Sequence, residues 1–445
     1  MSIDKKIIAS IHPSGFSMSD SNFCSLNVLS DGDVYYTLCS HNIDTHGRMY
    51  RYNPETGAVS LFADLGVITG EAGKKTLPHG KSHSSIFEAE GKVYFSTHYG
   101  FYQGNEGKEE PAPPPEGYSP YPGGKIIEYD KASGDFHILA SAPPEEGIVT
   151  MNMDVERKMI YCLTWPKGIF MYYDVGKKEL KTIGQVSRGG EAGLGDNYFC
   201  LCRDFAIDPR DGTVYFTNAD GEVLQFSTDT GKVETVAGVH MKKDVFGILD
   251  PHKGGHTGYN WRKIVWNAQY EKFFGVHAKT GYLFSFDPKN KKIEILDRIC
   301  SEYSKKNGLY EFFRYGYLTL TMAPGDFDTL YYISGFYKFI NPDEEQGRLE
   351  MQQGSYDYAE KSYEEIMSYI SLITFHIPTG TYTDHGVIQL DDGRYPTLAQ
   401  SVALHPNGRI YTCPWLENTS RKPGEPIWQY CDLISFERPQ PIRNK

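Results

Sequence analysis

Residues 92–98 read KVYFSTH, and after a gap of variable length residues 124–134 read GKIIEYDKASG. The first phrase alternates apolar with small or polar side chains at a period of two, which indicates a half-buried strand. The second phrase is another strand, which runs into a turn rich in Asp, Ser and Gly. The pair recurs along the whole chain, and its seven first strands lie at residues 33–40, 92–98, 159–165, 213–218, 272–277, 329–335 and 409–415.

The spacing of these phrases predicts the architecture. One aromatic residue of each first strand aligns with the others at intervals of 54 to 80 residues: Tyr35, Tyr94, Tyr161, Tyr215, Phe274, Tyr331 and Tyr411. A sheet unit repeated in this way must stack on its neighbours, and a closed ring also hides the strand edges. We therefore expect an all-β, seven-bladed β-propeller that occupies residues 1–445 as a single domain. A β-sandwich of unrelated strands would not explain the interval.

Two segments complete the predicted ring. Residues 5–11 (KKIIASI) are expected to supply the outermost strand of the last blade, so that the two ends of the chain close the ring. Residues 336–369 form an insertion in blade 6. Turns on one face are tight, whereas the connections on the other face are long, as in residues 101–123 and 238–261. We expect the binding residues on the face with the long loops.

Composition narrows the classes of function. Hydrophobic residues make up 40% of the chain, aromatic residues 14%, and 45 residues are glycine, which is typical of a turn-rich β protein. A net charge of −12 without a basic tract argues against nucleic acid as a partner. No stretch is long enough for a membrane span, and no signal peptide is evident. We expect a monomeric cytoplasmic protein, or a secreted or periplasmic one whose leader was removed.

Polar residues gather at the strand positions nearest to the channel mouth on the long-loop face. These are the starts of the innermost strands and the ends of the strands that follow them. The set is rich in His, Arg, Gln and Trp, and includes His41, His83, His98, His277, Arg203, Arg262, Gln400, Trp165 and Trp415. A single histidine is more often solvated or part of a core. The convergence of several on one mouth favours a functional site.

Several histidines with an arginine and aromatic walls suit the β-elimination of a uronic-acid polysaccharide. The C5 proton of a uronate can be removed only if the adjacent carboxylate is neutralised, which an arginine or a metal ion can do. A histidine or tyrosine then acts as the base, and a second group protonates the departing oxygen. Trp165, Trp415, Tyr99 and Tyr102 would offer stacking faces for sugar rings.

The chain also resembles a known family. The segments LPHGKSHSSIFEAEGKVYFSTHYGFY from Leu77, CLTWPKGIFMYYD from Cys162 and YFCLCRDFAIDPRDGTVYFT from Tyr198 resemble propeller-type polysaccharide lyases. The nearest groups are the ulvan lyases and the rhamnosyl-glucuronate lyases, with the oligogalacturonate lyases more distant. The neighbourhoods of His83, His98 and Arg203 carry the resemblance most specifically.

The resemblance implies roles for individual residues. His83 would be the base, His98 its partner or the acid, and Arg203 the group that holds the uronate carboxylate. The remaining substrate contacts would be His256, His277, Arg262 and Gln400, while Tyr198 and Tyr259 are the nearby options for a catalytic tyrosine. The implied partner is a glycan that contains a uronic acid of the glucuronate type.

Two other classes of function stay open. A propeller can be a non-catalytic platform that binds a glycan or a protein, in which case the mouth need not contain histidines. It can also be a lactonase or another metal-dependent hydrolase, but this would require rim carboxylates around a divalent ion. Gln400 and His405 leave a Ca, Mn or Zn ion open as a cofactor.

Overall fold

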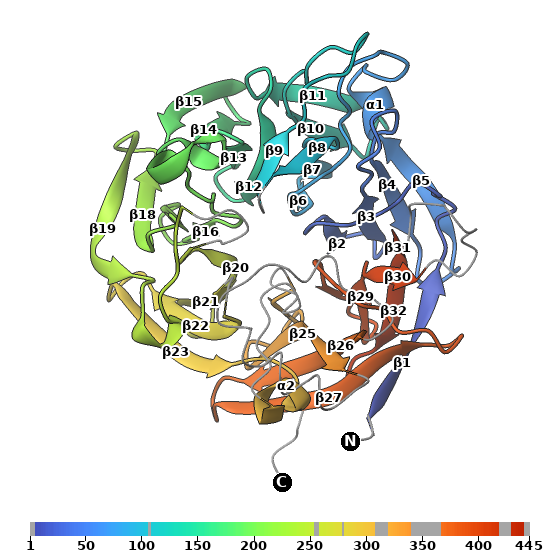
Figure 1. Ribbon diagram of the computed structural model, residues 1–445, viewed down its shortest axis with the longest axis vertical. Helices are drawn as coiled ribbons and strands as arrows, with labels where there is room; N and C mark the ends of the chain where they lie inside the picture. The colour runs from blue at the N-terminus through green and yellow to red at the C-terminus, as the bar shows by residue number, and fades with distance from the viewer. Residues whose placement is uncertain are drawn as a thin grey trace.

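The computed structural model describes residues 5–105, 108–252, 258–277, 280–307, 319–339, 366–417 and 429–439. Its sheets are arranged radially around a central axis, which is the arrangement of a β-propeller (Figure 1). The predicted all-β propeller is therefore confirmed. Residues 340–365, which make up most of the expected insertion, lie outside the described residues.

Five four-stranded sheets follow one another in the described chain. Within each of them the neighbouring strands are antiparallel. The first sheet contains β2 (Leu26–Val28), β3 (Val34–Leu38), β4 (Arg48–Tyr52) and β5 (Val59–Asp64). The second contains β6 (Phe87–Ala89), β7 (Lys92–Ser96), β10 (Lys125–Asp130) and β11 (Phe136–Ser141). The third contains β12 (Gly147–Asp154), β13 (Met159–Trp165), β14 (Ile169–Asp174) and β15 (Glu179–Gln185). The next two contain β16 (Ala206–Ile207), β17 (Val214–Thr217), β18 (Glu222–Ser227) and β19 (Lys232–His240); and β20 (Trp261–Asn267), β21 (Lys272–His277), β22 (Tyr282–Asp287) and β23 (Lys292–Arg298).

An eight-stranded sheet joins the two ends of the chain. The N-terminal strand β1 (Lys6–His12) pairs antiparallel with β32 through Ile11 and Ile434, and parallel with β27 through Ile7 and Ile388. The N-terminal strand β1 thus lies between β32, the last strand of the chain, and β27. The order of the sheet is β24 (Thr321–Met322), β25 (Thr329–Phe339), β26 (Ile366–His376), β27 (Thr381–Leu390), β1, β32 (Leu433–Glu437), β29 (Arg409–Thr412) and β28 (Ala403–Leu404).

Short elements occupy the connections between these strands. Two hairpins are formed by β8 (Tyr102–Asn105) with β9 (Lys108–Pro111) and by β30 (Trp415–Glu417) with β31 (Gln429–Cys431). The described helical segments are α1 (Leu65–Ile68), α2 (Glu302–Asn307), η1 (Gly190–Ala192), η2 (Gly195–Asn197) and η3 (Asp244–Phe246). None of the helices in the described part of the chain is long and apolar enough to cross a membrane.

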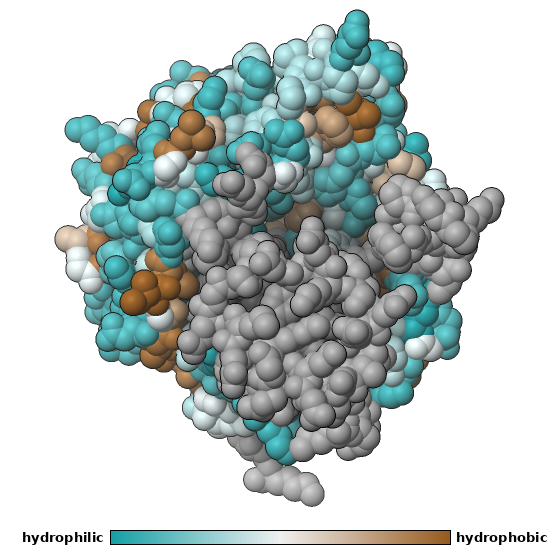
Figure 2. Space-filling view, in the orientation of Figure 1, coloured by the Kyte–Doolittle hydropathy of each residue, from teal (hydrophilic) through white to brown (hydrophobic). Residues whose placement is uncertain are grey.

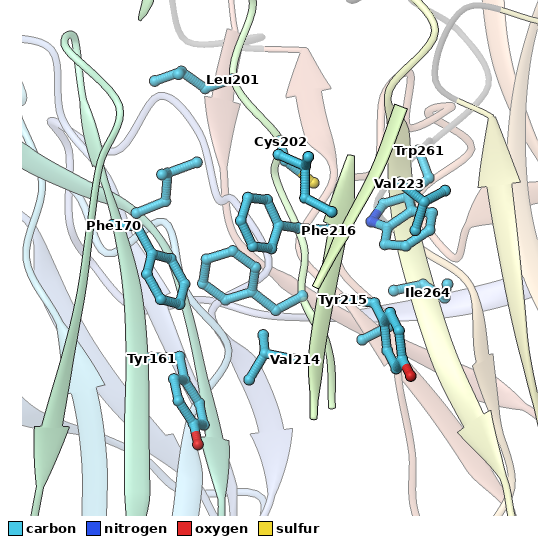
Figure 3. Packing of buried hydrophobic residues seen from close by; sticks show 14 of the residues in the cluster. Tyr161, Phe170, Leu201, Cys202, Val214, Tyr215, Phe216, Val223, Trp261 and Ile264 are labelled. Atoms are coloured by element: carbon cyan, nitrogen blue, oxygen red, sulfur yellow. The ribbon is translucent and has the colours of Figure 1, made fainter. Parts of the chain in front are cut away.

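Aromatic side chains fill the spaces between neighbouring sheets. In Figure 3, Phe170 of β14, Phe216 of β17 and Trp261 of β20 belong to one buried cluster that spans three sheets. Phe170 and Phe216 stack with their ring centroids 5.4 Å apart. Burial of such a side chain contributes about 1.5–3 kcal/mol, so this packing holds the sheets in fixed positions. The loops at their ends are thereby supported by a rigid scaffold.

Candidate functional site

The centre of the candidate site is a pair of short extended segments beyond the ends of β6 and β7 of the second sheet. Lys81 and His98 form an antiparallel bridge, in which the amide of His98 donates to the carbonyl of Lys81 at 2.8 Å. The segments can approach because Gly80 and Gly100 face each other: a Cβ atom on Gly80 would lie 2.3 Å from the Cα of Gly100. His83 lies two residues after Lys81, so in extended chain both side chains are directed to the same face.

His83 is held in one orientation. Its Nδ1 lies 2.8 Å from the carbonyl oxygen of Val149 and must donate to it, which leaves Nε2 as the hydrogen-bond acceptor of the neutral ring. The imidazole stacks on Phe23 with the centroids 5.0 Å apart. Burial, and next the charges of Arg203 and Lys81, lower the pKa of His83 well below 6.5. The ring is therefore neutral at neutral pH, and Nε2 is available as a base.

His98 lies beside His83, with their ring centroids 5.7 Å apart. Burial and the charge of Lys81 lower its pKa well below 6.5. Its Nδ1 has no hydrogen-bond partner among the described residues. A Cβ atom on Gly147 would lie 2.2 Å from this nitrogen, so the glycine leaves the space that the imidazole occupies.

Arg203 belongs to a buried hydrogen-bonded network. Its Nη2 lies 2.6 Å from Oε1 of Glu191, and its Nη1 donates to the carbonyl of Leu201 at 3.1 Å. The other carboxylate oxygen of Glu191 accepts from Nε1 of Trp165 at 2.8 Å. Burial alone would raise the pKa of Glu191, but the charge of Arg203 and the hydrogen bonds hold it below 4.5. Arg203 therefore has a carboxylate partner within the protein.

Lys81 is the second cation of the site. The residue is 2% exposed, and its Nζ lies 4.0 Å from the ring centroid of Tyr102 and 4.8 Å from that of Phe23. Burial lowers its pKa below 10.5, with Glu109 opposing this shift and Arg203 adding to it. In the described part of the chain, no carboxylate lies within ion-pair distance of its Nζ.

His41 completes the group around Lys81. Both its backbone amide and its Nδ1 lie 2.7 Å from the carboxylate of Asp20, and its ring contacts Tyr102 edge to face. Burial and the charge of Lys81 lower the pKa of His41 in spite of Asp20. The three histidines His41, His83 and His98 are thus close enough to Lys81 for its charge to act on each of them.

Other predicted residues extend the site or lie behind it. Trp165 is 2% exposed and packs against His98 and Tyr99, so it supports the site from behind and does not offer the exposed stacking face that the sequence predicts. Tyr198 is buried with Lys108 Nζ 4.6 Å from its ring centroid. Its pKa is raised by burial and by Glu191, so its phenol stays protonated and can donate a proton but not accept one at neutral pH.

Two further predicted residues, His277 and Tyr259, pack against the connection between β19 and β20. His277 is fully buried and stacks on Phe246 with centroids 3.9 Å apart, and its Nδ1 lies 2.9 Å from Oγ1 of Thr280. The hydroxyl of Tyr259 donates to the carbonyl of Gly247 and accepts from an amide of the same loop. Both residues therefore order structure near the rim.

Three further residues that were predicted to contact the substrate lie elsewhere in the fold, and a fourth lies outside the described residues. Arg262 of β20 is 8% exposed, and its charge acts on His83. Gln400 is 7% exposed, and its Oε1 has no hydrogen-bond partner among the described residues. Trp415 begins β30 and is half-buried. His256 lies outside the described residues.

The described donors do not form a metal centre. No group of three or more His, Cys, Asp or Glu side chains placed to hold a metal ion occurs in the described residues. Both ring nitrogens of His405, considered above as a ligand, bond to the backbone: Nε2 lies 2.8 Å from the carbonyl of Gly32, and Nδ1 accepts from the amide of Asn407. His405 is thus occupied in joining two turns.

Two residues of the site were missed by the sequence analysis. Lys81 stands two positions before His83 in an extended segment, and this spacing could have placed both on one face. Glu191 lies in a glycine-rich loop without periodicity, and its contact with Arg203 carries no local signal. Glu191 is therefore found only from the structure.

Comparisons with known proteins support the fold. No family model and no curated protein matches the sequence. Among solved structures, a chain of the mitotic checkpoint complex matches with a TM-score of 0.50 and 12% identity, over 98% of this chain and 94% of that chain. A proposed 6-phosphogluconolactonase from Bacteroides uniformis matches with a TM-score of 0.45 and 12% identity, over 84% and 88%. At 12% identity, the similarity to the chain of the mitotic checkpoint complex concerns the fold alone.

Proposed function

We propose that this chain is a polysaccharide or oligosaccharide lyase that cleaves the glycosidic bond next to a uronic acid of the glucuronate type. The observation that carries the proposal is the state of His83. Its Nδ1 is fixed on the carbonyl of Val149, its ring is neutral, and Nε2 remains as an acceptor beside cationic groups. A neutral base next to positive charge is what the removal of a proton α to a carboxylate requires.

The proposed reaction is a β-elimination with balanced proton transfers. Nε2 of His83 takes the proton from C5 of the uronate, and the electrons of the C5–H bond form the C4–C5 double bond. The bond between C4 and the glycosidic oxygen breaks, and this oxygen receives a proton from the phenol of Tyr198 or from water. The imidazole of His98 is neutral, because its pKa lies well below 6.5, so it does not serve as the acid. Positive charge at the mouth stabilises the negative charge that develops on the carboxylate.

We also infer that the ring has seven blades. The eight-stranded sheet divides at the parallel contact between β1 and β27 into two runs of four strands. One run consists of β24 to β27, and the other of β28, β29, β32 and β1. Together with the five four-stranded sheets, these two runs make seven units of equal strand number, as the spacing of the sequence phrases predicts.

The experiment is an assay for the unsaturated product. The purified chain is incubated with a panel of glucuronate-containing glycans, and the ultraviolet absorbance of the unsaturated uronate is recorded. We expect a signal with at least one glycan and a loss of at least about a hundredfold in His83→Ala. His137→Ala, at an exposed position of β11, is the matched control and should retain full activity. Cleavage without new absorbance, or no cleavage of any glycan, would contradict the proposal.

A non-catalytic propeller that binds an acidic glycan is the second candidate. This candidate is favoured by the buried cation Lys81, which would attract a carboxylate whether or not a reaction follows. A non-catalytic binding function gives no role to the hydrogen-bond acceptor Nε2 of His83. In that case His83→Ala would bind an acidic glycan as the parent does, and neither protein would release an unsaturated product.

A further inference from the structure

We propose that Lys81, lodged between Phe23 and Tyr102, is the group that pairs with the negative charge of the ligand, so that the carboxylate of the sugar acid is received by Lys81 and not by Arg203. The identity of the ligand as a sugar acid rests on the function proposed above. The choice of Lys81 over Arg203 as the partner of the ligand carboxylate rests on the contacts that these two side chains make within the protein.

Arg203 is already neutralised within the protein. Its guanidinium lies 2.6 Å from Glu191, and the side chains of both residues are less than a tenth exposed, at 7% and 4%. The carboxylate of Glu191 is itself fixed by the amide of Leu201 at 2.9 Å and by the indole of Trp165. A ligand carboxylate would have to displace a buried, hydrogen-bonded partner, which is costly.

Lys81 lacks such a partner in the described part of the chain. Its Nζ contacts the faces of two aromatic rings, which stabilise a cation but do not neutralise it. Two described carboxylates act on Lys81 from outside ion-pair distance: Glu109, which is exposed, and Asp20, which is bound to His41. A buried ammonium without a counter-ion is unfavourable, and an anionic ligand would supply that counter-ion.

The position of Lys81 also fits the proposed chemistry. The residue forms a backbone bridge with His98 and precedes His83 by two positions, so its charge lies on the same face as both histidines. A carboxylate held at Nζ would bring the adjacent C5 atom of a sugar acid towards these rings. Lys81 would then act both in binding and in stabilising the charge that develops on that carboxylate.

The test measures binding without turnover. D-glucuronate has no glycosidic substituent at C4 to eliminate, so its affinity for the full chain can be measured by calorimetry, with D-glucose as the neutral probe. We expect glucuronate to bind more tightly than glucose, and Lys81→Met to weaken glucuronate binding about tenfold or more. Lys81→Arg should restore part of the affinity. Lys92→Met, at the start of β7 and paired with Glu128 at 2.6 Å, should bind as the parent does.

Two results would overturn the inference: equal binding of glucuronate and glucose by the parent, or unchanged glucuronate binding in Lys81→Met. If Lys81→Met fails to fold, amine acetylation of the parent followed by mass spectrometry replaces it, and glucuronate but not glucose should protect Lys81. The lyase proposal fails separately. A chain that binds glucuronate through Lys81 but forms no unsaturated product contradicts the lyase alone, whereas Lys81→Met with unchanged affinity and elimination contradicts this inference alone.

Discussion

Burial determines the protonation of individual residues around the site. His79, His83 and His98 are all buried, and desolvation is the main reason that the pKa of each lies well below 6.5. Hydrogen bonds hold the two rings in place, His79 to Tyr121 at 2.8 Å and His83 to a carbonyl, and desolvation keeps both rings neutral. The same burial that prepares a neutral base makes the folded protein sensitive to acid.

This sensitivity can be measured as a pH dependence of stability. In the unfolded chain these histidines take up protons near pH 6.5, whereas in the folded chain they do so only at lower pH. The unfolded state therefore binds more protons below pH 6.5, and the free energy of unfolding should fall as the pH drops through that range. Denaturant unfolding at a series of pH values should show a slope that His98→Gln reduces by up to about 1.4 kcal/mol per pH unit.

His137→Gln is the control for this measurement, because His137 is exposed on β11 and its substitution removes no buried imidazole. Its slope should equal that of the parent. An unchanged slope in His98→Gln would show that His98 does not titrate differently in the folded and unfolded states.

At the scale of elements, glycines decide how closely the segments of the site approach. Gly80 and Gly100 bring the Lys81 and His98 segments together, and Gly147 at the start of β12 leaves room for the imidazole of His98. The third sheet thus shapes a site whose residues His83 and His98 lie in the segments that flank β6 and β7 of the second sheet. Neighbouring sheets are coupled through this contact as well as through their aromatic core.

We expect Gly147→Ala to displace His98. The new Cβ would lie 2.2 Å from Nδ1 of the imidazole, so the ring must move. Elimination should slow by about tenfold or more, because a misplaced group loses its orientation towards the substrate. The assay for unsaturated product measures this, and the histidine signals in nuclear magnetic resonance spectra should shift.

Gly176→Ala in the turn after β14 serves as the matched control, since its Cβ would lie 3.4 Å from Asp174, near ordinary contact. It should retain the activity and the spectrum of the parent. Normal histidine signals in Gly147→Ala would contradict the steric argument.

For the whole molecule, the decisive contact is the one that joins the chain ends. β1 pairs with β32 near the C-terminus and with β27, and buried Ala9 belongs to the core under the eight-stranded sheet. Figure 1 shows β1 along the outer edge of the ring beside β27 and β32. Figure 2 shows mostly hydrophilic side chains on the described part of the viewed face, with scattered apolar groups. Exposed strand edges would be the main new association surface if β1 were lost.

Removal of residues 1–12 should therefore destabilise the ring. The unpaired edges of β27 and β32 can pair with other chains, so we expect a lower melting temperature and self-association. Thermal unfolding and size-exclusion chromatography measure the two effects. Ile8→Thr keeps the backbone pairing of β1 and changes a side chain that is 58% exposed, so it should behave as the parent. A monomeric truncated chain with an unchanged melting temperature would show that β1 does not close the ring.

The propeller could be predicted because its signals are local. Period-two strands, tight turns and an interval of 54 to 80 residues are properties of short stretches, and stacking of repeated sheets follows from their shared need for burial. The same regularity placed His83, His98 and Arg203 near one mouth. In the structure His83 and His98 lie side by side, and the charge of Arg203 acts on both, whereas their position at a mouth and their roles in catalysis stay predictions.

The partners of these side chains were decided by tertiary structure alone. The sequence by itself determined repeated strands and their arrangement in a ring, and it predicted a rim rich in histidine. Only the fold paired Arg203 with Glu191, turned Trp165 away from the surface and left Lys81 between two aromatic rings. The reason is physical: such contacts join irregular loops and separate sheets, where no periodicity relates one residue to the next and burial depends on every neighbouring segment.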